Sequence, residues 1–211
     1  MSMFHHESLH RGAEALERLA SVHVTLCGAG ALGSPIAEGL ARSGCRMLTI
    51  VDQDRVEERN LSTQGWDRAD IGSPKARLLA NALYRAVGAE VEAKPLRLVE
   101  HNVRKLLRGS DLVVDAFDNS PSRQLVTEYC RQNSIPCLHA GLADGYGEVI
   151  WNDLYRVPGP SQDDVCDYPL ARNLATLASA VACEVALGFL LGQGQRSFTV
   201  TLADLSIRPY E

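Results

Sequence analysis

Residues 24–33, Val-Thr-Leu-Cys-Gly-Ala-Gly-Ala-Leu-Gly, decide the fold of this chain. The apolar run 24–27 has the composition of a buried strand, and glycine then recurs in the pattern GxGxxG. Such a turn lets the backbone approach a phosphate, and the following helix directs its N-terminal amides at anionic oxygens. A second apolar run, 47–51, ends in Asp52, an acid placed to accept from both ribose hydroxyls. The candidate nucleotide-binding residues of the turn are Gly28, Gly30, Ala31 and Gly33.

Outward from this turn, strand-length apolar runs alternate with stretches of helical periodicity. We expect strands at 22–27, 46–51, 90–95, 112–116, 137–140 and 148–152, helices at 34–43, 74–87, 100–107, 121–132 and 173–191, and a hairpin at 197–208. Alternation predicts an α/β, Rossmann-like, mainly parallel sheet with helices on both faces. The late strands lack crossover helices and predict antiparallel edge strands. An amphipathic helical arm, about 4–20, precedes the first strand, and 1–211 is expected to be one domain.

The composition excludes several classes of protein. The chain has 211 residues and a net charge of −5, which argues against a nucleic acid held by general electrostatics. We read no apolar stretch as long enough to span a membrane, and the polar N-terminus lacks a signal-peptide core, so a cytoplasmic location is expected. The six cysteines include no CxxC pair, so no structural zinc is expected.

The polar residues after the second strand distinguish this chain from a nicotinamide-dependent oxidoreductase, which would fit only the glycine turn and Asp52. They are Asp54, Asn60 and Gln64 in the segment 60–64, and Lys75 at the end of 71–75. Asn60 and Gln64 can bind a triphosphate or fix their loop. Lys75 begins a helix, where the dipole disfavours a cation, so a phosphate would explain it; the alternative is a solvated surface lysine.

Asp118 and Asn119 follow the buried strand 112–116. The ligand of an open α/β sheet lies at the carboxyl ends of its strands, so the glycine turn, Asp52 and Asp118 point at one crevice. Asp118 is placed to hold Mg²⁺ beside phosphates. Its alternative role is to cap the helix 121–132, a role that Asn119 or Ser120 can also fill.

Together these residues resemble the ThiF/MoeB/HesA family of E1-like (ubiquitin-activating-enzyme-like) adenylation domains, from about residue 9 to 208. The matching motifs are GAGALG at 28–33, VDxD at 51–54, NLxxQ at 60–64, IGxPKA at 71–76 and DxxDN at 115–119. Arg123 matches an arginine after the last motif, and 182–192 resembles a late helix with an internal Glu184. Their order and spacing carry the resemblance.

The resemblance implies ATP-dependent adenylation of the C-terminal glycine of a ubiquitin-like or sulfur-carrier protein. By family position, Asp52 binds ribose, Asn60, Gln64 and Lys75 bind phosphates, and Asp118 binds Mg²⁺. A homodimer is expected, because the family pairs through this domain. The chain looks similar to minimal E1-like proteins of bacterial ubiquitin-like conjugation operons, some with antiphage roles, which implies a possible E2-like partner.

Two departures from the family pattern matter. Thr63 stands where the family usually has an arginine in NLxRQ. Arg59, or Arg11 from a dimer partner, can replace that phosphate clamp. Many relatives carry two CxxC pairs around a crossover loop, and here only Cys166 aligns with part of the first pair. Related enzymes often pass the activated acyl group to a cysteine in this region, so the resemblance suggests Cys166 as the nucleophile that accepts it. An incidental loop cysteine, or a remnant of a lost zinc site, are the alternatives.

The leading hypothesis is therefore an E1-like adenylyltransferase. A sulfur-carrier adenylyltransferase for thiamine or molybdopterin synthesis is the runner-up within the fold, and a tRNA-modifying dehydratase of the same superfamily fits less well. Two hypotheses come from other classes. If the chain is an oxidoreductase, it should bind NADH; if it is a nucleotide-binding scaffold that has lost catalysis, it should bind ATP without pyrophosphate exchange.

Overall fold

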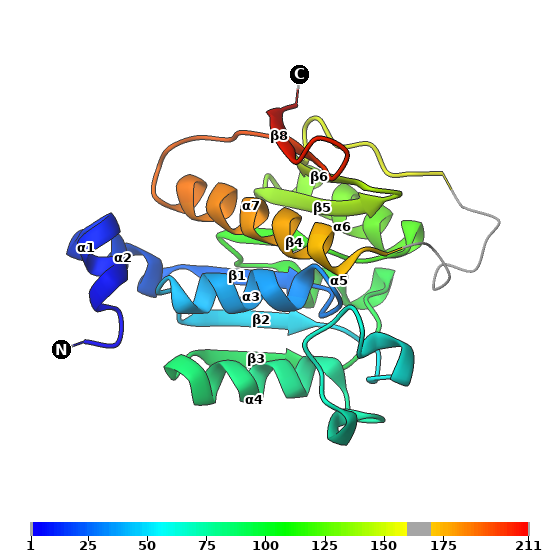
Figure 1. Cartoon of the computed structure of the whole chain (residues 1–211). Helices are drawn as coiled ribbons and strands as arrows, with labels where there is room; N and C mark the ends of the chain where they lie inside the picture. The colour runs from blue at the N-terminus through cyan, green and yellow to red at the C-terminus, as the bar shows by residue number, and fades with distance from the viewer. Residues whose placement is uncertain (1, 160–169, 211) are drawn as a thin grey trace.

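A computed structural model describes residues 2–159 and 170–210 of the chain, and its centre is an eight-stranded sheet (Figure 1). The strand order is β3-β2-β1-β4-β5-β6-β7-β8, with parallel pairing from β3 to β5 and antiparallel pairing from β5 to β8. The strands are β1 His23–Cys27, β2 Met47–Val51, β3 Glu90–Lys94, β4 Leu112–Asp115, β5 Cys137–Ala143, β6 Tyr146–Trp151, β7 Phe198–Thr201 and β8 Ser206–Pro209. The expected mainly parallel sheet with antiparallel edge strands is confirmed.

Helices cover both faces of the sheet. They are α1 His5–Arg11, α2 Ala13–Ser21, α3 Gly33–Arg42, α4 Lys75–Val87, α5 Glu100–Leu107, α6 Ser120–Gln132 and α7 Arg172–Leu190, with short 3₁₀ turns at Glu58–Asn60 and Arg68–Asp70. One core joins a sheet face to α3, α4 and α7, and a second joins the opposite face to α5 and α6 (Figure 1). Alternate side chains of one strand enter different cores: Leu26 of β1 packs in the first and Cys27 in the second.

Two sequence expectations need correction. The N-terminal arm is two helices, because Gly12 between them adopts φ 91° and ψ 156°, outside the helical region. The 19-residue α7 is long and apolar enough, by length and composition, to cross a membrane. In this fold its apolar composition has another explanation, since α7 packs against α3, β5 and β6 and lies largely in the first core.

The first five strands in the sheet order run parallel, so their carboxyl ends meet at one edge. The loops after β1, β2, β3 and β4 all leave the sheet there, and they carry the residues described next.

Candidate nucleotide-binding site

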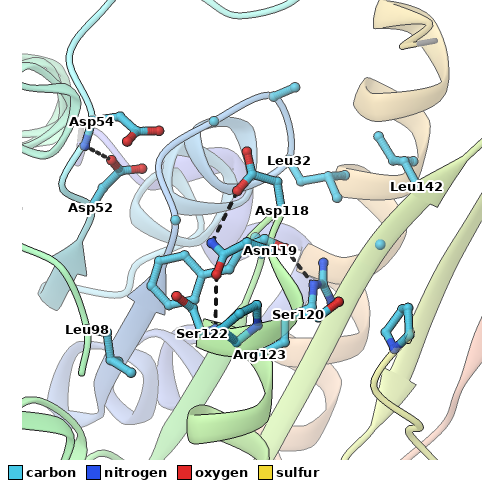
Figure 2. A pocket seen from close by; sticks show the side chains of 18 of the residues that line it. Leu32, Asp52, Asp54, Leu98, Asp118, Asn119, Ser120, Ser122, Arg123 and Leu142 are labelled. Carbon is cyan, nitrogen blue, oxygen red and sulfur yellow. Dashed lines mark hydrogen bonds between the residues drawn. The ribbon is translucent and has the colours of Figure 1, made fainter. Parts of the chain in front are cut away.

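A cavity of about 950 Å³ lies at the carboxyl edge of the parallel strands. Its walls come from the loops after β1, β2, β3 and β4, from the start of α6, and from the β5–β6 hairpin. Figure 2 shows Asp52 and Asp54 on one side of the glycine turn, with Asp118 and Asn119 on another and Leu142 of β5 beyond them. This volume suits a ligand of nucleotide size.

The glycine turn needs its glycines for close backbone packing. Gly28 has φ 101°, and a Cβ there would lie 2.7 Å from the Ala116 carbonyl oxygen of the loop after β4. A Cβ on Gly33 would lie 2.0 Å from the Gly28 carbonyl oxygen. Gly28 and Gly30 line the cavity, as does Ala31, whereas Gly33 packs beneath the turn. The turn therefore offers the cavity bare backbone.

Asp52 ties the loop after β2 to the glycine turn. Its Oδ2 accepts a hydrogen bond from the Ala29 amide at 2.6 Å, and its Oδ1 accepts one from the Asp54 amide at 2.7 Å. Burial raises the pKa of Asp52, although these two amides and Lys75 oppose that rise. Each carboxylate oxygen keeps a free lone pair, so Asp52 is able to accept from a ligand hydroxyl as well.

Lys75 is a buried cation at the first position of α4. Its side chain is 7% exposed, and its Nζ lies 3.6 Å from Oδ2 of Asp54, which is about half exposed. The backbone amide of Lys75 donates to the Asp54 carbonyl at 2.9 Å, which holds the helix start against the loop. The buried ammonium faces the cavity, so the surface-lysine reading is wrong. An anionic ligand would complete the neutralisation that Asp54 begins.

Gln64 directs an amide donor at the glycine turn. Its Oε1 accepts from the Trp66 indole at 2.7 Å, so the Nε2 end turns toward Gly30, where an added Cβ would meet it at 3.9 Å. Arg172, the first residue of α7, donates to the Gln64 carbonyl at 3.1 Å. Trp66 therefore orients the carboxamide, and Arg172 holds the backbone at Gln64, before any ligand binds.

Asp118 projects into the cavity without serving as the helix cap. The cap of α6 is Asn119, whose Oδ1 accepts from the Ser122 amide at 3.0 Å. The Asn119 Nδ2 lies 3.4 Å from Oδ1 of Asp118, and Asp118 is otherwise exposed on the cavity wall (Figure 2). Its carboxylate is therefore available to a ligand.

A divalent cation finds only part of a site here. Across residues 2–159 and 170–210, no group of three or more His, Cys, Asp or Glu side chains could hold a metal on its own. Asp118 fits Mg²⁺ in the way that nucleotide enzymes use it, because Mg²⁺ is commonly bound by one or two carboxylates, waters and substrate phosphates.

Arg123 fastens the Asp118 loop to the rest of the site. Its buried guanidinium donates to the Phe117 carbonyl at 2.6 Å, to the Tyr155 hydroxyl at 2.8 Å and to the Ala140 carbonyl at 2.7 Å. Three segments therefore meet on one side chain: the loop after β4, the middle of β5 and the chain beyond β6.

A buried acid lies beneath this arginine. Asp115, at the end of β4, lies 3.8 Å from Arg123 and 2.8 Å from His139 of β5. Burial alone would raise the pKa of Asp115, but Arg123 and His139 together bring it below its ordinary value. His139 also meets the Asn152 side-chain oxygen at 2.9 Å and stacks on the Tyr155 ring at 3.8 Å. This polar layer supports the cavity from below.

Other sequence candidates lie elsewhere. Asn60 does not line the cavity; its Oδ1 accepts from the Glu57 amide at 3.0 Å within a capping box. Arg59 donates to Glu57 at 2.7 Å. Arg11 is held in its own chain by Glu7 at 2.8 Å and Glu184 at 2.5 Å, away from the cavity-lining residues. Cys166 lies outside the described residues.

Sequence reasoning missed several lining residues. Leu96, Arg97 and Leu98 follow β3, whose carboxyl end shares the edge that the other loops use. Their only signal in the sequence is that they follow the carboxyl end of a parallel strand, where the ligands of such sheets bind. Tyr146 and Glu148 reach the cavity from β6. Glu148 is an acid within the otherwise apolar run 147–151, which was the one available signal. The register of the β5–β6 hairpin, which sets Glu148 opposite Gly141, brings this acid to the cavity.

Comparison with known proteins identifies the family. The ThiF family matches residues 6–207. The SAMP-activating enzyme E1 of Haloferax volcanii is 35% identical over 197 residues, which cover 87% of this chain and 73% of that protein. The sulfur carrier protein adenylyltransferase of Thermus thermophilus is 42% identical over 120 residues, 56% of this chain and 44% of that protein.

The fold is shared with Escherichia coli MccB. Its structure with MccA-N7isoASN gives a TM-score of 0.86 at 15% identity, covering 100% of this chain and 72% of that one. Its structure with ATP gives a TM-score of 0.83 at 17% identity, with coverage of 100% and 71%. At these identities the likeness concerns the fold. With its family match over nearly the whole described chain, this protein belongs to the ThiF family of E1-like adenylyltransferases.

Proposed function

We propose that this protein joins AMP from ATP to the C-terminal carboxylate of a ubiquitin-like or sulfur-carrier protein and releases pyrophosphate. One observation carries the proposal: the bare glycine turn, Asp52, the buried Lys75 and Asp118 surround a single cavity of about 950 Å³. The names of the relatives agree, since they include an E1 enzyme and a sulfur carrier protein adenylyltransferase.

Each group has a defined task in the proposed reaction. A carboxylate oxygen of the carrier attacks the α-phosphorus, the bond from that phosphorus to the bridging oxygen breaks, and pyrophosphate leaves with the electron pair. Lys75 and the Gln64 amide lie where negative charge grows on the phosphates, and fixed donors stabilise such charge without reorganising. Asp52 accepts from the ribose hydroxyls. Mg²⁺ held by Asp118 and the phosphates would supply additional neutralising charge.

ATP–pyrophosphate exchange tests this proposal. With a cognate carrier, the wild type is expected to incorporate labelled pyrophosphate into ATP, and Asp118→Ala is expected to abolish the exchange. Asp153→Ala is the matched control, because Asp153 is exposed and does not line the cavity. ATP binding without exchange beside the true carrier would instead identify a nucleotide-binding scaffold.

The step after adenylation belongs to the same proposal. The carrier's acyl group passes from the adenylate, with release of AMP, either to Cys166, as a thioester, or directly to an E2-like partner in a bacterial conjugation or antiphage pathway. The alternative is a sulfur-carrier adenylyltransferase for thiamine or molybdopterin synthesis. Mass spectrometry after reaction with carrier and ATP separates these routes: a carrier adduct that hydroxylamine cleaves and Cys166→Ala eliminates supports the thioester.

We also propose a homodimer in which Arg11 serves the partner's cavity in place of the arginine missing at Thr63. Arg11 would first have to leave Glu7 and Glu184, which hold it within its own chain. A monomeric mass of 23.0 kDa by gel filtration coupled to light scattering would remove this role for Arg11.

A further inference from the structure

The β5–β6 end of the cavity carries a carboxylate that the proposed reaction does not use. Glu148 lies on β6, where it pairs with Gly141 of β5 and Thr199 of β7. Its neighbours Gly147 and Val149 face α7, so Glu148 points to the opposite face of the sheet, together with Tyr146. Both Tyr146 and Glu148 line the cavity.

The sequence makes room for this side chain. A Cβ on Gly141 would lie 3.1 Å from Oε1 and 3.3 Å from Cγ of Glu148, so glycine lets the carboxylate lie flat over β5. The flanking β5 side chain on that face, His139, is already engaged by Asp115 and Asn152. The carboxylate of Glu148 is therefore held at the cavity wall and does not turn into the polar layer below.

Within residues 2–159 and 170–210, the Glu148 carboxylate lacks a hydrogen-bond donor. In the part of the chain that the structure describes, no side chain or amide donates a hydrogen bond to its carboxylate, and no cation lies within 4 Å. Arg123 exerts the largest effect of a nearby charge on Glu148, but its guanidinium already donates to Phe117, Tyr155 and Ala140. Burial accordingly raises the pKa of Glu148, although Arg123 and His139 oppose the rise.

An ionised carboxylate only accepts, so its missing partner is a donor, and a cation suits it best. Tyr146 adds an aromatic wall on the same face of the strand, and aromatic faces attract ammonium and guanidinium groups. An acidic group at this place would instead meet like charge. The combination favours a lysine or arginine side chain over a neutral or acidic one.

We propose that Glu148 selects carriers with a basic residue at about the third position from the C-terminus. This inference rests on the proposed adenylation, which brings the carrier's tail into the cavity. Asp118 follows β4 and Glu148 lies on β6, two strands away, a separation of roughly 10 Å at about 4.8 Å per strand. An extended tail covers that distance in about three residues.

Three synthetic peptides test the proposal. They share one sequence, end in Gly-Gly with a free carboxylate, and carry Arg, Gln or Glu at the third position from the end. Binding is measured by fluorescence anisotropy in the presence of a non-hydrolysable ATP analogue and Mg²⁺, and turnover by pyrophosphate exchange. The enzymes are the wild type, Glu148→Gln, Glu148→Lys and the control Glu90→Gln, an exposed acid on β3 at the opposite edge of the sheet.

The wild type and Glu90→Gln are expected to bind the Arg peptide about tenfold more tightly than the Gln peptide, the ratio that one charge-assisted hydrogen bond supports. Glu148→Gln is expected to lose this preference, and Glu148→Lys to favour the Glu peptide. Equal binding of all three peptides by the wild type, or an unchanged preference in Glu148→Gln, would overturn the inference. If the wild type prefers the Arg peptide in binding but shows no pyrophosphate exchange, the result would count against adenylation and would still support the role of Glu148 in carrier selection.

Discussion

Replacing Arg123 by methionine tests how the site is built. The Arg123 side chain is 9% exposed. Methionine keeps much of its buried aliphatic stem and removes the guanidinium. The Phe117 and Ala140 carbonyls and the Tyr155 hydroxyl each lose a donor at 2.6–2.8 Å. Asp115, fully buried, keeps His139 and the Phe117 amide but loses the nearby positive charge.

The expected cost follows from these contacts. Removing one member of a buried charged network typically costs about 3–5 kcal/mol, because the other member stays buried and undercompensated. Three separate hydrogen bonds to a charged group would sum to more, but bonds in one network are not additive. We therefore expect Arg123→Met to lower the free energy of unfolding by about 4 kcal/mol, or the Tm by roughly 8–16 °C for a domain of this size.

Urea unfolding followed by circular dichroism, with a thermal scan beside it, measures both quantities. The control is Arg85→Met, an exposed arginine in the last turn of α4, which is expected to stay within about 0.5 kcal/mol of the wild type. Arg123→Lys should restore little, because an ammonium lacks the planar fork that reaches three acceptors. An unfolding free energy for Arg123→Met within about 1 kcal/mol of the wild type would refute the role of this network.

Three further changes have defined outcomes. Lys75→Met should lower kcat/KM for ATP in pyrophosphate exchange by about a hundredfold, whereas Lys105→Met, exposed on α5, should leave it unchanged; equal values would remove the phosphate role. Glu148→Gln should raise the Tm of the ligand-free protein at pH 7, because burial raises the pKa of this acid and so penalises its ionised form. The gain should shrink as pH falls through the raised pKa of the folded acid and should be absent below about 4.3, where the acid is neutral in the unfolded chain as well; a gain that persists there would contradict the cause given. Gly33→Ala, whose Cβ would lie 2.0 Å from a carbonyl oxygen, should destabilise the fold by at least about 2 kcal/mol. Gly65→Ala, which meets nothing within 4 Å, should not.

The sequence was sufficient for the parts of the site that follow strand ends. Gly28 and Asp52 come directly after apolar runs and Asp118 lies three residues past β4, and parallel pairing of β1, β2 and β4 brings those ends to one edge. Local signals of this kind need only the strand order of the fold. They predicted the sheet, and they led to the cavity that the structure contains.

Other features depend on contacts between distant segments. Arg123 occupies an ordinary helical position in sequence, and only the return of β5 and Tyr155 reveals its buried acceptors. Glu148 becomes a cavity residue through the hairpin register that sets it opposite Gly141. Asn60 shows the reverse error, since its side chain completes a local capping box and does not line the cavity. Side-chain competition of this sort is not visible in motif spacing.

The most direct test of the central claim is a crystal structure of the protein with a non-hydrolysable ATP analogue and Mg²⁺. The account predicts one nucleotide across the glycine turn, with its ribose hydroxyls on Asp52, its phosphates near Lys75, and the metal between the phosphates and Asp118. A cavity that stays empty at saturating nucleotide, or an Asp118 carboxylate turned away from the polyphosphate, would contradict it.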